Sequence, residues 1–179
     1  MSKEANMFHA SLRRLQSAVL FGAALAVSGT AMADGDSRGL RVPLLPKYQQ
    51  ECAACHLAYP PALLPAGSWQ RLMGGLDRHF GSDASLDAAT RQQIERWLQA
   101  HAGTGKRMTE APPQDRITRS AWFERKHREI DPSVWRLNSV KSAAHCAACH
   151  TGAERGDFDD DRLKVPEGLA ASLRRPWNH

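Results

Sequence analysis

The sequence predicts a mostly α-helical fold with long loops. Apolar residues recur at helical spacing in segments such as 69–80 and 86–101. No segment shows the alternation of apolar and polar residues that is typical of a strand. Clusters of proline and glycine in 58–67 and 102–118 indicate loops between the helices. A chain of 179 residues forms one domain, or two small lobes at most.

Residues 1–33 are expected to be a cleaved secretory signal peptide. They begin with three basic residues: Lys3, Arg13 and Arg14. The apolar run over 18–27 is shorter than the roughly 20 residues that cross a bilayer, which argues against the alternative of a retained membrane anchor. Ala31 and Ala33 are small residues at the positions that a signal peptidase recognises. We therefore expect a mature, exported, soluble chain that begins near Asp34 and does not span a membrane.

The first predicted helix spans 46–56. It begins with Pro46, because proline is well suited to the first position of a helix. The loop over 58–67 contains three prolines and is therefore expected to be stiff and extended.

Two amphipathic helices are predicted next, over 69–80 and 86–101. Ser68 and Ser85 are the expected N-caps. The apolar residues at helical spacing are Trp69, Leu72, Met73 and Leu76 in the first helix, and Leu86, Ile94, Trp97 and Leu98 in the second.

The second half of the chain is expected to contain a helix over 119–130, a short turn or helix at Trp135, and a helix over 142–150. Residues 102–118 are predicted to be a linker. It would separate a first lobe, 34–101, from a second lobe, 119–179.

All four cysteines lie in two Cys-x-x-Cys-His motifs. The motif residues are Cys52, Cys55 and His56, and then Cys146, Cys149 and His150. This motif is the attachment signature of a c-type haem. The two cysteines form thioethers with the haem, and the adjacent histidine coordinates the iron. We therefore expect two covalent haems, which would form much of the core.

Two other arrangements of the cysteines are conceivable: two disulfides or one zinc site. A disulfide within Cys-x-x-Cys closes a very small loop and so adds little stability. A zinc ribbon places its second pair about 15–20 residues after the first, whereas 90 residues separate the two pairs here. Neither alternative explains why a histidine follows each pair at once.

Charge argues against a nucleic-acid partner. Loss of residues 1–33 removes Lys3, Arg13, Arg14 and Glu4, so that the 24 basic and 19 acidic side chains become 21 and 18. The propionates of two haems would bring the mature protein close to neutrality, whereas a nucleic-acid partner requires a strong basic patch.

The second axial ligand of each iron decides the function, because a closed iron passes electrons and an open iron binds gases or peroxide. His79 and His127 are the predicted distal ligands. Each lies on an apolar helical stripe, with Leu72 and Leu76 or with Phe123 and Ile130. His79 follows His56 by 23 residues, and His127 precedes His150 by 23 residues. A crossed pairing, in which each lobe's histidine serves the other haem, remains open.

Other side chains are weaker candidates for the distal positions. His101 lies in the last turn of its helix, where histidine commonly serves the helix end. His145 directly precedes Cys146 and lies on the attachment side of its own haem. Met73 is explained by packing, whereas Met108 in the linker is the best methionine alternative.

Several of these segments resemble the dihaem cytochrome c (DHC) family, over roughly positions 46–166. The matching segments are ECAACHLAYPPALLP from Glu51, Ser68-Trp69 with Leu72-Met73, His79-Phe80-Gly81, Trp122-Phe123 with Arg125-Lys126-His127, and Val140-Lys141-Ser142 before CAACH. The resemblance implies a small, periplasmic, class I-like electron-transfer protein with bis-histidine ligation at both irons. By position, His79 and His127 match the distal histidines of the family. It also implies exchange of electrons with a small high-spin monohaem cytochrome c and a membrane b-type cytochrome.

Three functions are therefore open to a protein with two c-type haems. The first is an electron carrier with two low-spin haems, relaying electrons between a membrane or soluble donor and a small c-type cytochrome, with no catalytic residue. The second is a dihaem peroxidase, for which no acid–base group is suitably placed. The third is a gas-binding haem protein with one open iron.

Overall fold

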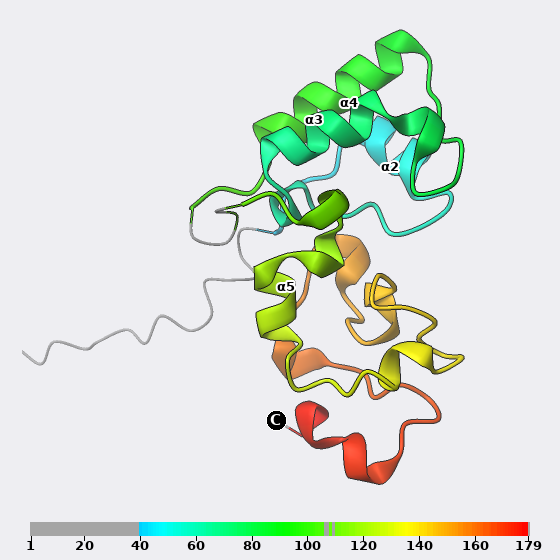
Figure 1. Ribbon diagram of the computed structural model, residues 1–179, viewed down its shortest axis with the longest axis vertical. Helices are drawn as coiled ribbons and strands as arrows, with labels where there is room; N and C mark the ends of the chain where they lie inside the picture. Colours follow the sequence, from blue (N-terminus) through cyan, green and yellow to red (C-terminus); the bar gives the residue numbers. More distant parts are fainter. Residues whose placement is uncertain (1–39, 106–107, 109, 179) are drawn as a thin grey trace, which may run out of the picture. The chain divides into compact units, whose positions relative to one another are not determined.

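The computed structural model describes residues 40–105, 108 and 110–178, all within one unit of the chain. The predicted signal peptide lies outside the described residues, and so does His179. Four α-helices are present among the described residues: α2 (Pro46–Cys52), α3 (Ala66–Gly74), α4 (Ala88–Ala100) and α5 (Ala121–Lys126), as Figure 1 shows. The described residues contain no strand, only three isolated β-bridges. The prediction of a helical fold with long loops is confirmed.

Short 3-10 helices connect the α-helices, and beyond α5 they are the only helical elements among the described residues. They are η1 (Pro61–Leu63), η2 (Leu76–Arg78), η4 (Pro113–Asp115), η5 (Ile117–Arg119), η6 (Val134–Arg136), η7 (Cys146–Ala148), η8 (Ala153–Arg155), η9 (Asp160–Arg162), η10 (Ala171–Leu173) and η11 (Arg175–Trp177). The turn predicted at Trp135 is η6. None of the helices in the described part of the chain is long and apolar enough to cross a membrane.

The helix predicted over 69–80 is present as α3, but its predicted bounds are wrong. The helix begins at Ala66, with Pro65 as its N-cap, and Ser68 is a buried residue within its first turn. It ends at Gly74, because Gly74 and Gly75 together disfavour helix continuation. The chain then turns through η2 and reaches His79.

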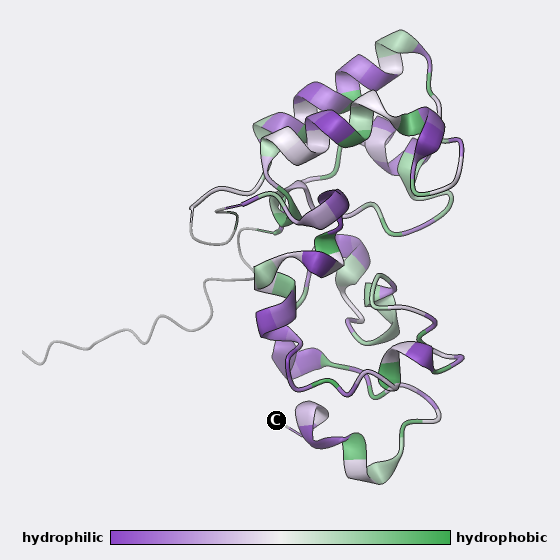
Figure 2. Ribbon diagram, viewed as in Figure 1, coloured by the Kyte–Doolittle hydropathy of each residue, from purple (hydrophilic) through white to green (hydrophobic). Residues whose placement is uncertain are grey.

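Helix α4 was predicted with the wrong N-cap. The Asp87 carboxylate, rather than Ser85, accepts the hydrogen bond from the Thr90 N–H at 3.0 Å. Helix α4 packs against α3. Ile94 and Leu98 lie on the contact face and are fully buried, whereas most of the remaining surface of α4 is hydrophilic (Figure 2).

Two predicted helices in motif-bearing segments are shorter than expected. Helix α2 ends at Cys52 rather than at His56, so the rest of the first motif lies in a turn. The helix predicted over 142–150 is wrong, because only the single turn η7 forms there. His145, with φ of −86° and ψ of 68°, departs from helical geometry and interrupts this segment.

Helix α5 also ends earlier than predicted, at Lys126 rather than at Ile130. The Ser120 hydroxyl accepts from the Phe123 N–H at 3.1 Å and so caps its start. His127 is the C-cap residue, so the end of the helix fixes its position.

The buried apolar side chains of the described residues form three clusters. The first core consists of Tyr48, Ala58, Leu64, Trp69, Met73, Ile94 and Leu98. The second core consists of Leu40, Ala62, Leu63, Met108, Trp122 and Phe123. The third core consists of Val134, Val140 and Leu169.

The proline-rich loop over 58–67 contributes side chains to the protein interior. Leu64 belongs to the first core and Leu63 to the second. The predicted linker contacts this loop, because the Gly103 N–H donates to the Leu64 carbonyl at 2.8 Å. The division into two lobes at 102–118 stays a prediction.

Candidate haem sites

The first site is built where α2 ends. Cys52 is the last residue of that helix, and Cys55 and His56 follow in the exposed turn. Both cysteines are free thiols. Burial raises the pKa of the Cys52 thiol to about 11, so it is protonated at neutral pH.

His79 lies opposite His56. The centroids of the two imidazole rings are 6.0 Å apart, and the ring planes are inclined by 29°. The backbone reverses just after His79, with φ values of 50° at Phe80 and 98° at Gly81. The positive φ at Phe80 is a strained conformation for a bulky residue, and this sharp turn orients His79 toward His56.

The two rings of this pair differ in their hydrogen bonds. His56 Nδ1 lies 2.7 Å from the Leu57 carbonyl oxygen, so a hydrogen on Nδ1 is favoured and Nε2 keeps its lone pair. His79 Nδ1 is buried without a hydrogen-bond partner. Burial, and to a smaller degree the neighbouring His56, lowers the pKa of His79.

The second site is built on η7 and the end of α5. Cys146 is the first residue of the single turn η7, Cys149 is its C-cap residue, and His150 follows. Burial raises the pKa of Cys146 to about 11. Burial, and then the nearby His127, lowers the pKa of His150 to about 4.

His127 faces His150 across this site. The ring centroids are 6.2 Å apart and the planes are inclined by 77°. His127 Nδ1 lies 2.9 Å from the Phe123 carbonyl, and the Phe123 ring stacks on it with a centroid separation of 4.0 Å. Burial lowers the pKa of His127.

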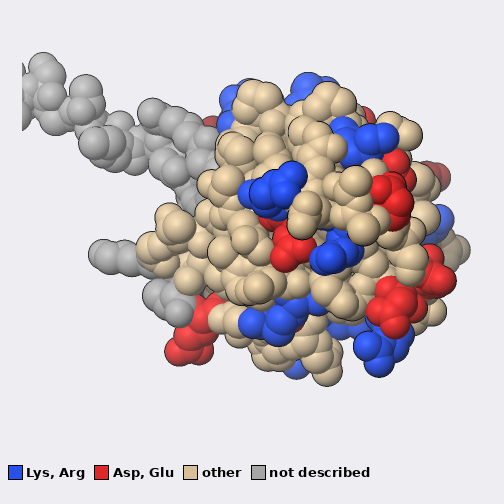
Figure 3. Space-filling model, turned by 90° about the horizontal axis from the view of Figure 1, so that it is seen from above, with Lys and Arg blue, Asp and Glu red and all other residues tan. Residues whose placement is uncertain are grey.

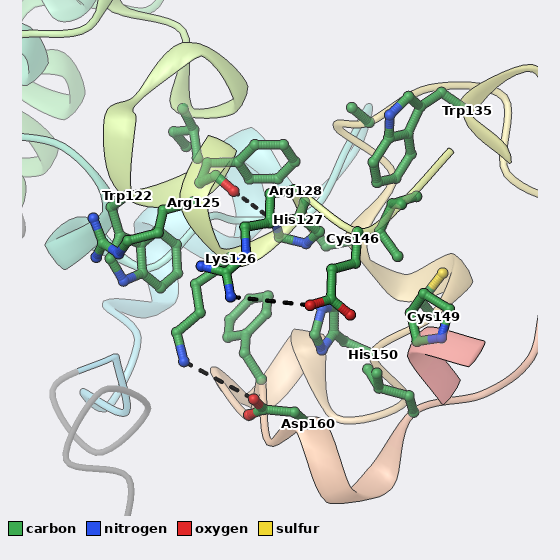
Figure 4. Close-up of a pocket in the computed structure, with 18 of the residues that line it drawn as sticks. Trp122, Arg125, Lys126, His127, Arg128, Trp135, Cys146, Cys149, His150 and Asp160 are labelled. Carbon is green, nitrogen blue, oxygen red and sulfur yellow. Dashed lines mark hydrogen bonds and ion pairs between the residues drawn. The ribbon is translucent and has the colours of Figure 1, made fainter. Parts of the chain in front are cut away.

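A cavity of about 470 Å³ contains this second pair (Figure 4). Its walls include the aromatic side chains of Trp122, Phe123, Trp135, Phe158 and Trp177. Cys146, Cys149 and His150 of the second motif line this cavity together with His127. A mostly apolar cavity with a few convergent polar groups is typical of a cofactor site.

Charged side chains of α5 and the turn after it border this cavity. Lys126 pairs with Asp160 at 3.9 Å, and Arg128 pairs with Glu129 at 3.9 Å (Figure 4). Positively and negatively charged side chains therefore both lie where the apolar cavity meets solvent.

A comparison with protein-family models decides the family. The model for dihaem cytochrome c matches residues 48–158, which include both motifs and both facing histidines. The chain belongs to the dihaem cytochrome c family. The predicted resemblance and the prediction of two c-type haems are confirmed.

Solved structures agree with this assignment. A crystal structure of DHC from Rhodobacter sphaeroides is 50% identical, covers 65% of this chain and 99% of its own, and has a TM-score of 0.57. A dihaem cytochrome c from Shewanella baltica OS155 is 38% identical, covers 70% of this chain and 96% of its own, and has a TM-score of 0.61. No curated protein matches the chain.

The residues of this dihaem cytochrome fit the two haems. Four unpaired thiols are available for the thioethers. The buried and partnerless Nδ1 atoms of His79 and His150 belong to rings that face a second imidazole, and metal coordination is a reason to bury such a ring. The described residues contain no group of three or more His, Cys, Asp or Glu side chains arranged to hold a metal ion by themselves.

The remaining histidines and methionines have other surroundings. His101 is exposed at the end of α4, and its Nδ1 lies 2.8 Å from the Trp97 carbonyl. His145 lines the second cavity, with Nδ1 3.0 Å from the Val140 carbonyl. Met73 packs in the first core and Met108 in the second.

Sequence reasoning missed the aromatic residues around the histidines. Tyr59 stacks on His56 at a centroid distance of 5.1 Å, and Phe158 meets His150 edge-on at 5.3 Å. Trp135 contacts His127 at 5.9 Å. Only Tyr59 carried a local signal, because it follows its histidine by three residues.

Proposed function

We propose that this chain is an electron carrier in which two histidines close each haem iron. Cys52, Cys55 and His56 attach the first haem, with His79 as its distal ligand. Cys146, Cys149 and His150 attach the second haem, with His127 as its distal ligand. When bound, each haem supplies a one-electron Fe(III)/Fe(II) couple.

The observation that carries the proposal is the spacing of the two histidine pairs. A metal–imidazole bond is about 2 Å long, and about 1 Å more separates the bonded nitrogen from the ring centre, so two imidazoles on one metal have centroids about 6 Å apart. The measured separations are 6.0 Å for His56 and His79, and 6.2 Å for His127 and His150. These distances favour the uncrossed pairing over the crossed one.

The protonation of these rings supports the same conclusion. A histidine must be neutral to bind a metal. Burial lowers the pKa of His79, His127 and His150, so each ring is neutral at pH 7.

The chain's other contribution is to hold these rings and exclude water. Phe123 stacks on His127 and accepts a hydrogen bond through its carbonyl oxygen, which limits both rotation and tautomer. With both axial positions closed, no site for a substrate remains at either iron. Two histidine ligands also lack the methionine that raises cytochrome c potentials, so we expect low potentials.

We further propose that the protein acts in the periplasm. The proposal rests on the signal-like residues 1–33, and the test is the intact mass of the exported protein, which should lack them. Its expected partners are a small high-spin monohaem cytochrome c and a membrane b-type cytochrome, as the family resemblance suggests. Lys and Arg are interspersed with Asp and Glu on the face in Figure 3, which suits brief encounters with such proteins better than binding to nucleic acid.

Exposure of the reduced native protein to carbon monoxide tests the electron-carrier function. Two closed irons predict a low-spin spectrum that the gas leaves unchanged on mixing. A native high-spin haem that binds the gas and turns over peroxide would favour the peroxidase or gas-binding alternative instead.

A further inference from the structure

Tyr59 contacts both candidate haem sites. Its ring stacks on that of His56, with centroids 5.1 Å apart and planes inclined by 27°. Its hydroxyl donates a 2.8 Å hydrogen bond to the carbonyl oxygen of Ala144. Ala144 lies two residues before Cys146. One side chain therefore touches the histidine of the first motif and the backbone that leads into the second.

Tyr59 is also fixed at its backbone. The hydroxyl of Tyr48 donates a 2.8 Å hydrogen bond to the Tyr59 carbonyl oxygen. Tyr48 is buried in α2, the helix that ends at Cys52. The Tyr59 side chain packs against both the first and the second core. The residue is thus anchored in the first site and reaches the second.

The hydroxyl of Tyr59 is suited to a permanent donor role. Burial, with a smaller contribution from Cys146, raises the pKa of this phenol to about 12. The group therefore keeps its proton throughout the physiological range and donates to the Ala144 carbonyl.

We propose that Tyr59 is a positioning residue that couples the two haem sites, by holding the second attachment segment at a fixed place relative to the first. This inference rests on the proposed function, since it takes His56 and Cys146 to hold the two haems. Tyr59 is neither oxidised nor reduced and transfers no proton. Its effect is structural. A change at one site alters the backbone that carries the other. A fixed distance between the two sites also keeps the rate of electron exchange between them constant.

The variant Tyr59→Phe in the haem-loaded protein tests this coupling, because it keeps the ring on His56 and removes only the bond to Ala144. The amides of Ala148, Cys149 and His150 are bonded within the second segment. We expect their hydrogen exchange to become roughly two- to tenfold faster, as for the loss of one hydrogen bond. We also expect the midpoint potential of the haem on Cys146 to shift, although Tyr59 touches only the other haem's histidine.

Tyr48→Phe is the matched control. It also removes a tyrosine hydroxyl that donates to a carbonyl at 2.8 Å, but both partners lie in the first site. Because Tyr59 keeps its own bond to Ala144 in this variant, the exchange of the three amides should change much less than in Tyr59→Phe. Tyr59→Leu, which also removes the stacking, should alter the spectrum of the haem on Cys52 and Cys55, whereas Tyr59→Phe should not.

The proposal is overturned if Tyr59→Phe leaves both the amide exchange and the potential of the second haem at their native values, or if Tyr48→Phe changes them equally. Failure of the proposed function is a separate result. It would show as gas binding by the native protein, and the amide exchange in Tyr59→Phe would still report on the contact with Ala144.

Discussion

The imidazole planes of His127 and His150 are inclined by 77°, whereas those of His56 and His79 are inclined by only 29°. The axial ligands are one of the means by which a protein tunes haem iron. Near-parallel imidazoles split the iron d orbitals that interact with them, and near-perpendicular imidazoles leave these orbitals almost degenerate. With the ligands proposed above, the two irons are therefore expected to differ electronically although their ligand sets are the same.

Electron paramagnetic resonance of the fully oxidised protein should show two low-spin ferric signals. We expect a rhombic signal from the haem of His56 and His79, and a signal with a large maximal g value from the haem of His127 and His150. Loss of the second signal in the variant Cys146→Ala/Cys149→Ala would assign it. Two rhombic signals in the native protein would contradict the ring geometry.

Both haems should remain attached after denaturation, because thioethers are covalent. The intact mass of the denatured protein should include two haems. Replacement of Cys52 and Cys55 by Ala should remove one of them, and replacement of Cys146 and Cys149 the other. Release of haem by acid and organic solvent from the unaltered protein would argue against covalent attachment.

The ion pair between Arg71 and Asp115 should make stability depend on pH. Arg71 donates to both carboxylate oxygens of Asp115, at 2.6 and 2.9 Å, and these bonds hold the pKa of Asp115 below its ordinary value. A lowered folded-state pKa contributes stability above the unfolded value of about 4, and this contribution is lost as the pH falls through the folded value. Since Arg71 is more than half exposed, we expect Asp115→Asn to cost about 1 kcal/mol or less at pH 7.

Denaturant unfolding from pH 7 down to pH 3 measures this effect. The difference between the native protein and Asp115→Asn should shrink as the pH falls below about 4. Asp77→Asn is the control, because its pair with Arg78 is exposed at both ends and should contribute almost nothing. A difference that stays constant across this range would show that the ionic pair is not its source.

Leu98 should be among the residues on which the first core depends most. Its side chain is fully buried where α4 packs on α3. We expect Leu98→Ala to lower the free energy of unfolding by about 2–5 kcal/mol, because it leaves a cavity. Gln93→Ala, at an exposed position of the same helix, should change it by about 0.5 kcal/mol or less.

Periodicity and motif spacing predicted much of this structure, and they failed where competing local signals were present. Ile94 and Leu98 mark the buried face of α4 clearly, because apolar residues repeat at helical spacing. The start of that helix was misplaced, because Ser85 and Asp87 are both suitable N-caps and only the bond from Thr90 distinguishes them. The alanine-rich segment before His150 has high helix propensity, but it is too short for propensity to decide its structure.

At the haem sites too, tertiary contacts could not be predicted from local sequence patterns. His79 and His127 do face His56 and His150, but the helical stripes that pointed to them are wrong, because α3 ends at Gly74 and α5 at Lys126. The contact of Tyr59 with Ala144 joins residues 85 positions apart, and no local pattern reports it. The aromatic surroundings of His127 also depend on tertiary packing, since Trp135 comes from a separate 3-10 helix.

The absorption spectra of three single variants test the ligand assignment most directly. His79→Ala and His127→Ala should each open one iron, giving one high-spin haem that binds carbon monoxide while the other haem stays low-spin. His101→Ala should leave both haems low-spin, because His101 is exposed and bonded to the Trp97 carbonyl. If His127→Ala leaves the spectrum unchanged while His101→Ala opens an iron, the assignment of the distal ligands is wrong.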